Sequence, residues 1–216
     1  MARSGIAIAP PDEYHLPRAG GGHRVGITFD DGFSSDLRCA ELLRKHNMKA
    51  LFFIPTATIG SPGFLSAADI RTLVQMGMTV GSHSHEHAHV TSESAENKSR
   101  ISKEILTQLV GSPVEDFAFP GGVCTTETIA SVFAAGYKRV YTIAWGVNGI
   151  SEFRSGVFRR NCLIQGMTDA QFMDLITAKN QNLRQALYMM KRVARRCLPQ
   201  QSYARLQRWY CGLQRQ

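Results

Sequence analysis

The chain has 216 residues, of which 44% are hydrophobic and 19% charged, a composition typical of one globular domain with a substantial core. No stretch of about 18 apolar residues occurs, which excludes a transmembrane helix. The formal net charge is +8, but nine lysines and arginines and no acidic residue fall within 175–216, so the preceding residues sum to −1. A uniformly basic nucleic-acid-binding domain would not concentrate its charge at one end, and we expect no nucleic-acid partner.

Residues 1–22 are rich in proline and glycine and are expected to form an irregular lead-in. The apolar patch at 6–9 is too short for the hydrophobic region of a secretory signal, so we expect a cytoplasmic protein. We expect the cysteines to be reduced thiols, because they are odd in number and lack a C-x-x-C pair. They are Cys39, Cys124, Cys162, Cys197 and Cys211.

Apolar runs and turn residues alternate along the chain from residue 25 to about residue 165. The apolar runs predict strands over 25–29, 49–54, 78–81, 114–119, 138–143 and 157–164. Helical periodicity with capping residues predicts helices over 36–46, 66–76, 92–110 and 125–135. Strands that alternate with helices in this way favour repeated βα units around a parallel sheet, which is an α/β fold.

Two adjacent carboxylates, Asp30 and Asp31, end the first of these strands and precede Gly32. Neighbouring residues on a strand face opposite sides, so the two aspartates can serve different partners. The end of a strand next to a turn is also where α/β enzymes place their chemistry. One aspartate of the pair can therefore bind a metal while its neighbour remains available as a base.

The segment 81–89 contains four of the chain's seven histidines, namely His83, His85, His87 and His89. Imidazole is the commonest side-chain metal ligand, and two histidines four apart can share one face of a helical turn. With a carboxylate they form a three-ligand site that keeps open positions, which suits catalytic zinc and also non-haem iron(II). The pattern predicts a metal site and leaves both metals open.

Two motifs of the chain resemble those of the polysaccharide deacetylase family, the NodB-homology domain of carbohydrate esterase type. They are Thr28–Phe29–Asp30–Asp31–Gly32 and His83–Ser84–x–x–His87, and the run Phe117–Gly122 resembles the third motif of the family. The resemblance covers about residues 22–165. It implies an irregular (β/α) barrel of about seven parallel strands, with its site at the carboxyl ends of the strands.

The resemblance also implies a reaction, the removal of N-acetyl groups from an N-acetylhexosamine in a polysaccharide or a lipid-linked saccharide. Asp30 would be the general base, while Asp31, His83 and His87 would hold the metal, usually zinc. Metal and base together would generate a hydroxide that attacks the acetyl carbonyl. The position of the third motif indicates that the backbone N–H of Gly121 stabilises the oxyanion. The residues expected to contact the sugar are Phe119, Pro120 and Trp145.

Two features of the family pattern are missing from the chain. Many members have an arginine in the third motif that steadies the base, and this chain has Ala118 there. A late histidine usually supplies the general acid, but none follows His89, and Asp169 and Asp174 are weak substitutes in an expected helix. His85 or His89 could take the acid role, although we expect each to face solvent or to support the metal ligands. The departures leave open a same-fold hydrolase of a formyl or cyclic amide, and a degenerate barrel that binds glycan without turnover. A non-haem iron oxygenase is a more remote alternative.

Residues 167–216 lie outside the resemblance, so the chain divides into a lead-in at 1–22, a barrel at 23–166 and this tail. Apolar residues recur at helical steps from Leu183 to Cys197 with cations between them, which predicts a basic helical extension. Such a helix can pack on the barrel while its cations extend into solvent, which is the interpretation we favour. It can also lie on an anionic membrane, which would place the protein peripherally on the inner face.

Overall fold

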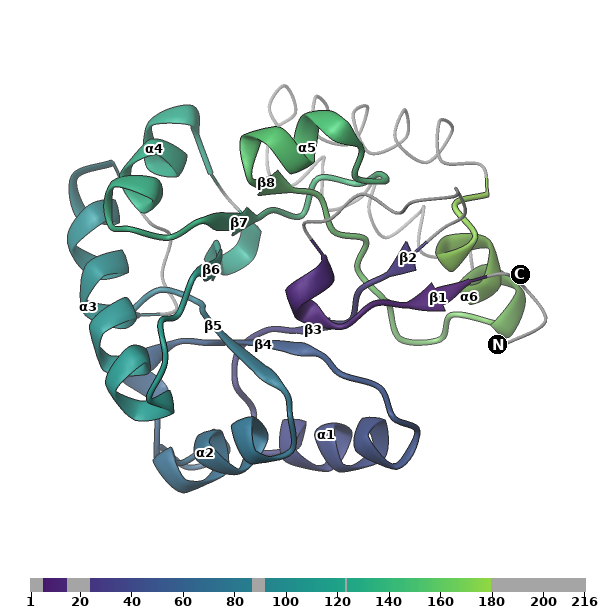
Figure 1. Cartoon of the computed structure of the whole chain (residues 1–216), viewed down its shortest axis with the longest axis horizontal. Helices are drawn as coiled ribbons and strands as arrows, with labels where there is room; N and C mark the ends of the chain where they lie inside the picture. The colour runs from purple at the N-terminus through teal and green to yellow at the C-terminus, as the bar shows by residue number, and fades with distance from the viewer. Residues whose placement is uncertain (1–5, 15–23, 87–91, 123, 180–216) are drawn as a thin grey trace, which may run out of the picture.

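The computed structural model describes residues 6–14, 24–86, 92–122 and 124–179, and its central element is a curled sheet of six parallel strands (Figure 1). The strands follow one another in chain order, each hydrogen-bonded to the next. They are β3 (Thr28–Phe29), β4 (Leu51–Ile54), β5 (Thr79–Ser82), β6 (Asp116–Ala118), β7 (Arg139–Tyr141) and β8 (Val157–Phe158). The predicted α/β fold is therefore confirmed, and the strand count roughly fits the expected seven.

Four helices cover the outer face of this sheet (Figure 1). They are α1 (Asp36–Lys45), α2 (Ala67–Gln75), α3 (Ser92–Val110) and α4 (Thr126–Ala134). Ser66 and Thr125 cap α2 and α4, because each side-chain oxygen accepts a hydrogen bond from the backbone N–H three residues further on. All four helices lie within one residue of the bounds that the sequence predicts.

The lead-in is not wholly irregular, contrary to expectation. Its strand β1 (Ala7–Ile8) pairs in parallel with β2 (Arg24–Val25), and a 3-10 turn, η1 (Pro11–Glu13), follows β1. The two strands form a separate small sheet. The strand expected over 25–29 was therefore wrong as a single element, because β2 and β3 belong to different sheets.

Tyr14 explains the break between β2 and β3. Its hydroxyl donates to the carbonyl of Ile27 at 2.9 Å and accepts from the N–H of Ile27 at 2.8 Å. Its ring lies so close to Gly26 that a Cβ there would be 2.8 Å from two ring carbons. The side chain thus bonds to both backbone groups of Ile27, whose carbonyl also accepts from the N–H of Leu51 in β4. Gly26 is needed for the close approach of the Tyr14 ring.

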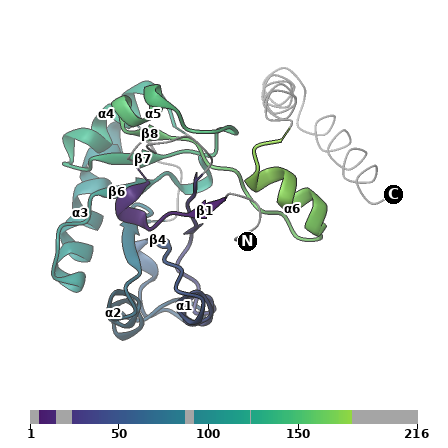
Figure 2. The same ribbon diagram turned by 45° about the vertical axis from the view of Figure 1, so that its right-hand side comes forward.

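The last expected strand, 157–164, was too long. After Phe158 the backbone N–H of Arg159 bonds to the side chain of Asn148 at 2.8 Å, so the strand ladder stops there. The elements α5 (Ile150–Ser155) and α6 (Asp169–Ile176) flank this part, and the 3-10 turns η2 (Thr56–Thr58) and η3 (Pro120–Gly122) follow β4 and β6. Helix α6 lies on the side of β1, away from α1 to α4 (Figure 2).

Most of the basic tail, including the helix expected from Leu183 to Cys197, lies outside the described residues. Its packing against the barrel, or its contact with a membrane, therefore stays a prediction. Among the residues that the structure describes, no helix combines the length and apolar character needed to cross a membrane.

Both faces of the sheet are buried, which explains the continuous apolar run of β4. Leu51 and Phe53 face the concave side and Phe52 and Ile54 face the helices, as the alternation of side chains along a strand requires. The concave side holds the interior cluster, which consists of Leu51, Phe53, Ala118, Tyr141 and Phe158. The helix side holds the larger outer core.

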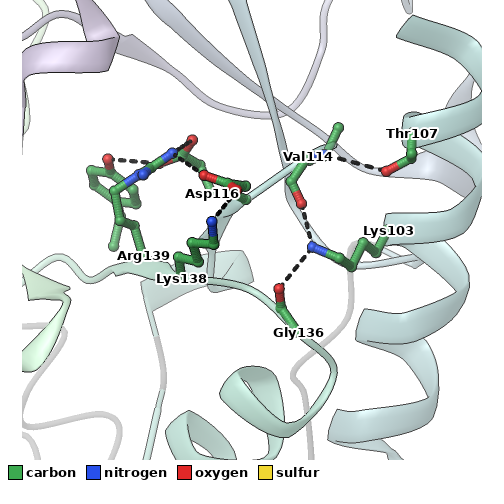
Figure 3. A network of polar contacts seen from close by, with 9 residues as sticks. Lys103, Thr107, Val114, Asp116, Gly136, Lys138 and Arg139 are labelled. Carbon is green, nitrogen blue, oxygen red and sulfur yellow. Dashed lines mark hydrogen bonds and ion pairs between the residues drawn. The ribbon is translucent and has the colours of Figure 1, made fainter. Parts of the chain in front are cut away.

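A buried ion pair joins β6 and β7 near their amino-terminal ends, away from the carboxyl ends where the site is expected (Figure 3). Arg139 donates to both carboxylate oxygens of Asp116, at 2.6 and 2.8 Å, and the hydroxyl of Tyr141 donates to the same carboxylate at 2.9 Å. Asp116 is 4% exposed. Burial and the neighbouring carboxylate raise the pKa of Tyr141 well above its ordinary value, which keeps the phenol neutral as a donor.

Replacement of Arg139 by alanine leaves the Asp116 carboxylate buried beside a single phenol donor. We expect Arg139→Ala to lower the free energy of unfolding by about 3 kcal/mol, because a buried charge then lacks its counter-charge. Urea denaturation of the variant and the wild type at neutral pH measures this difference. Lys138→Ala is the matched control, because Lys138 pairs with Glu115 but is 68% exposed, so its loss should cost less than about 1 kcal/mol. Equal losses in the two variants would contradict the interpretation.

Candidate active site

The residues singled out in the sequence gather at the carboxyl ends of neighbouring strands. Asp30 and Asp31 follow β3, His83 follows β5, and the third motif continues from β6 into η3. Because the strands of the sheet are all parallel, these ends lie at one edge of the sheet, with β4 between β3 and β5. This is the edge where α/β folds place their sites. The expected location of the site agrees with this arrangement.

Asp31 and His83 face each other. The Oδ1 atom of Asp31 lies 3.4 Å from the Nε2 atom of His83, whose side chain is almost fully buried. The other ring nitrogen, Nδ1, lies 2.8 Å from the carbonyl oxygen of Ala118. A carbonyl can only accept, so Nδ1 carries the proton and donates, while Nε2 points toward Asp31.

This geometry fits a zinc ion. Two ligands of one tetrahedral zinc, each 2.0–2.1 Å from it, are themselves about 3.4 Å apart. A histidine that binds zinc through Nε2 commonly donates its other N–H to a backbone carbonyl, as His83 does. Asp31 and His83 therefore have the separation, the tautomer and the donor types of two zinc ligands.

The third expected ligand, His87, lies outside the described residues, and so does His89. Among the residues that the structure describes, no group of three potential ligands comes together. His85 is described, and its Nδ1 lies 2.8 Å from the hydroxyl of Thr56 in η2. That contact, together with a backbone bond from Ala57 to the carbonyl of His85, anchors the histidine segment to the loop after β4.

The chain adopts the left-handed conformation at both segments that carry the expected ligands. The φ angles are 76° at Asp31, 64° at Gly32 and 68° at Ser84. Such a conformation is uncommon for residues other than glycine and often marks a functional site. The N–H of Leu65 bonds to the carbonyl of Gly32, and the N–H of Ser84 bonds to the hydroxyl of Ser82, so local hydrogen bonds hold both turns.

A buried chain of hydroxyl groups supports the end of β5. The hydroxyls of Ser82 and Ser102 lie 2.7 Å apart, and the hydroxyl of Ser102 lies 3.1 Å from that of Tyr137. Tyr137 also donates to the carbonyl of Ser99 in α3 at 3.0 Å. Because buried polar groups are costly unless paired, this network fixes β5 against α3 directly beneath His83.

Asp30 forms an ion pair that the sequence motifs did not indicate. Arg160, two residues beyond β8, donates through Nη1 to Oδ1 at 2.6 Å and through Nη2 to Oδ2 at 2.9 Å. Nη1 also lies 3.2 Å from the hydroxyl of Thr28, and Nε donates to the carbonyl of Thr142 at 3.3 Å. No motif marks Arg160 in the sequence, and only its place after the last strand could have drawn attention to it.

Side-chain amides fix the segments on either side of this arginine. Asn161 accepts from the N–H of Gly146 and donates to its carbonyl, and Asn148 makes the same two bonds with the backbone of Arg159. Trp145 lies within the segment held in this way and is half-buried. Its position after β7 agrees with a wall of the site, so sugar contact by Trp145 stays a prediction.

The third-motif residues differ in their exposure. Gly121 is exposed and left-handed, with a φ of 61°, at the end of β6. A Cβ at the next residue, Gly122, would lie 2.2 Å from a side-chain carbon of Ile143, so only glycine fits at this position. Phe119 is 1% exposed and Pro120 is also buried, which is the environment of core residues that support the site rather than of a sugar-binding surface.

The late carboxylates lie in α6, as the sequence predicts. Asp169 is in its first turn, and Asp174 pairs with Lys179 at 3.5 Å.

A different acid lies near the paired aspartates, namely Asp36 at the start of α1, which is 6% exposed. Its Oδ2 atom lacks a hydrogen-bond partner among the described residues. Burial raises the pKa of Asp36 from 3.8 to about 6, and the negative charges of Asp31 and Asp30 act in the same direction.

The raised pKa of Asp36 predicts a pH-dependent stability. The native state holds the proton more tightly than the unfolded chain, so this carboxyl makes the free energy of unfolding fall as pH rises from about 4 to about 6. Asp36→Asn removes the charge, and we expect it to raise the free energy of unfolding of the metal-free protein by about 1–3 kcal/mol at pH 7.5. At pH 4, close to the ordinary pKa of an aspartate, most of the gain should be lost.

Urea titrations at several pH values in the presence of a chelator measure this effect. Asp174→Asn is the control, since its carboxyl lies on α6 and pairs with a lysine that is 68% exposed. A gain for Asp36→Asn of the same size at pH 4 and pH 7.5 would show that the carboxyl charge is not the cause.

A curled parallel sheet covered by helices, with paired aspartates and a buried histidine at its carboxyl edge, defines a (β/α) half-barrel of the deacetylase kind. The family profile described as polysaccharide deacetylase matches residues 18–140, which is more than half of the chain. The chain belongs to the polysaccharide deacetylase family.

Relatives agree with this assignment. The chain is 36% identical over 84 residues to the peptidoglycan-N-acetylglucosamine deacetylase PgdA of Listeria monocytogenes, a match that covers 38% of this chain and 17% of PgdA. It is 26% identical over 118 residues to YxkH of Bacillus subtilis, covering 53% of this chain and 42% of YxkH. The chain thus spans less than half the length of either relative.

Solved structures share the fold. The Streptococcus pyogenes deacetylase PplD in complex with acetate has a TM-score of 0.73 at 19% identity, and the match covers 82% of each chain. IcaB from Ammonifex degensii has a TM-score of 0.71 at 23% identity, covering 83% of this chain and 84% of IcaB. These similarities confirm the half-barrel architecture.

Proposed function

We propose that the chain is a metal-dependent hydrolase that removes the N-acetyl group from an N-acetylhexosamine unit of a glycan. The observation that carries this proposal is the Asp31–His83 pair, whose atoms are separated by 3.4 Å at the carboxyl edge of the sheet. Membership of the polysaccharide deacetylase family supports the reaction type. The names of two similar proteins add support, since PgdA is called a peptidoglycan-N-acetylglucosamine deacetylase and PplD was solved with acetate.

Asp31, His83 and His87 would hold the metal, with zinc the best fit to one carboxylate and two imidazoles. When bound there, zinc supplies Lewis acidity to water and to the amide carbonyl. The N–H of His83 toward Ala118 keeps the imidazole in the tautomer that leaves Nε2 available. The carboxylate of Asp31, which lies in the left-handed turn with Gly32, is 3.4 Å from that nitrogen.

Asp30 would act as the general base. Its carboxylate takes a proton from the water whose oxygen attacks the acetyl carbonyl carbon, and the amide C–N bond then breaks. The proton held by Asp30 is afterwards available to the departing amine nitrogen, so the products are acetate and a free hexosamine amine. The backbone N–H of Gly121 would donate to the carbonyl oxygen as negative charge develops on it.

Substitution of the two aspartates separates their roles. We expect Asp30→Asn to lower the rate of acetate release from N-acetylglucosamine oligomers about 10²–10⁴-fold while the zinc content remains, because a base is not a ligand. Asp31→Asn should lower both the activity and the zinc content. Acetate assays and elemental analysis of purified protein measure the two quantities. Glu104→Gln is the unaffected control, because this carboxylate is exposed on α3 and pairs with Arg100.

Each alternative function gives a different result in these assays. If Asp30→Asn also empties the zinc site, the assignment of the two aspartates is wrong. Release of formate from N-formyl sugars, or opening of cyclic amides, without acetate release would indicate another amide as the substrate. Wild-type protein that binds the oligomers and releases nothing would instead be a glycan-binding barrel.

A further inference from the structure

Ser82 and His83, which are neighbours at the end of β5, serve opposite faces of the sheet. The hydroxyl of Ser82, the last residue of β5, lies 2.7 Å from that of Ser102 in α3, so Ser82 faces the helices. His83 follows it and points the other way, toward Asp31, as the alternation along a strand requires. Both side chains are at most 1% exposed. A group on the helix side can therefore act on an expected metal ligand without touching it.

The hydroxyl of Ser82 provides a hydrogen bond at the point where the strand ladder ends. The N–H of His83 still donates to the carbonyl of Ile54 in β4, at 3.0 Å. The following N–H, that of Ser84, donates to the hydroxyl of Ser82 at 3.1 Å. Ser84 has a φ of 68°, a left-handed conformation that is unfavourable for a residue with a side chain. The hydroxyl of Ser82 thus stabilises the turn that leads from β5 into the histidine segment.

The hydroxyl of Ser82 is itself held by residues outside β5. The hydroxyl of Ser102 lies 3.1 Å from that of Tyr137. Ser102 and Tyr137 both donate to the carbonyl of Ser99 in α3, at 2.9 and 3.0 Å. Ser82 and Ser102 are 0% exposed and Tyr137 is 3% exposed. At such depth bulk water cannot replace a lost partner, so the orientation of the Ser82 hydroxyl depends on the other two.

We propose that Ser82 is a positioning residue of the metal centre, and that Ser102 and Tyr137 hold it in place. We call these three residues the hydroxyl relay. The inference rests on the proposed function, in which His83 binds zinc. The carbonyl of Ala118 orients the imidazole ring of His83, whereas the relay acts on the backbone that carries the ring. Ligands that are already in place bind a metal more tightly, because binding does not have to order them.

The affinity for zinc tests this proposal on the full chain. We expect Ser82→Ala to raise the Kd for zinc about 10–100-fold, which is the usual effect of losing a group that orients a ligand. Tyr137→Phe acts through two further hydroxyls, so it should raise the Kd by a smaller factor, about 3–10-fold. Titration of the metal-free protein with zinc against a chromophoric chelator measures these constants.

Tyr141→Phe is the matched control for Tyr137→Phe. Its hydroxyl is equally buried, at 3% exposure, but it donates to Asp116 near the amino-terminal ends of β6 and β7. We expect it to destabilise the metal-free protein much as Tyr137→Phe does, while the Kd for zinc stays within about twofold of wild type. Equal Kd shifts in the two tyrosine variants, or a wild-type Kd in Ser82→Ala, would overturn the proposal. The tyrosine variants decide the question by themselves if Ser82→Ala does not fold.

Amide hydrogen exchange in the metal-free protein gives a second measurement that needs neither zinc nor turnover. We expect the N–H of Ser84 to exchange faster in Ser82→Ala than in wild type, and to keep its wild-type rate in Tyr141→Phe. An unchanged rate at Ser84 in Ser82→Ala would contradict the role of the relay. Failure of the proposed reaction alone has a different signature, namely a wild-type protein that binds zinc and releases no acetate. A wild-type protein that binds no zinc would overturn both proposals.

Discussion

A sheet whose strands pair only with their neighbours in the chain has two outer edges, and in this protein one arginine side chain connects them. Arg160 contacts residues from both edges, while Phe53 supports it from the centre of the sheet. The carboxylate it binds is the one expected to take part in chemistry. The same pair of hydrogen bonds therefore links the two outer strands of the half-barrel and contacts both carboxylate oxygens of Asp30.

The fold and the location of the site could be predicted from the sequence because they depend on local patterns. Capping residues such as Ser66 and Thr125 set helix starts, and the apolar run at β4 identifies a strand buried on both faces. Asp31 and His83 come together because β3 and β5, on either side of β4, are parallel and have their carboxyl ends at one edge of the sheet. The contribution of His87 remains a prediction, since it lies outside the described residues.

The features that could not be predicted depend on contacts between distant residues. Nothing in the order of residues shows that the Tyr14 hydroxyl bonds to the backbone of Ile27, or that the Asn148 side chain bonds to the backbone after β8. The partner of Asp30 was missed for the same reason, since the arginine lies 130 positions away in a segment without a motif. Phe119 was expected to contact the sugar, but it is 1% exposed and packs in the outer core.

The sequential order of the strands also has a consequence for folding kinetics. Each strand pairs with the next one along the chain, so most of the sheet can form by closing short loops, which is fast. The bridge from Asp30 to Arg160 closes the longest loop of the sheet and gains nothing until both edges are in place. Partly folded molecules that retain only the central strands would keep the interior cluster without Phe158 and without an ordered Asp30 carboxylate. The geometry around Asp30 would then be the last part of the structure to form in folding and the first lost when an edge strand opens.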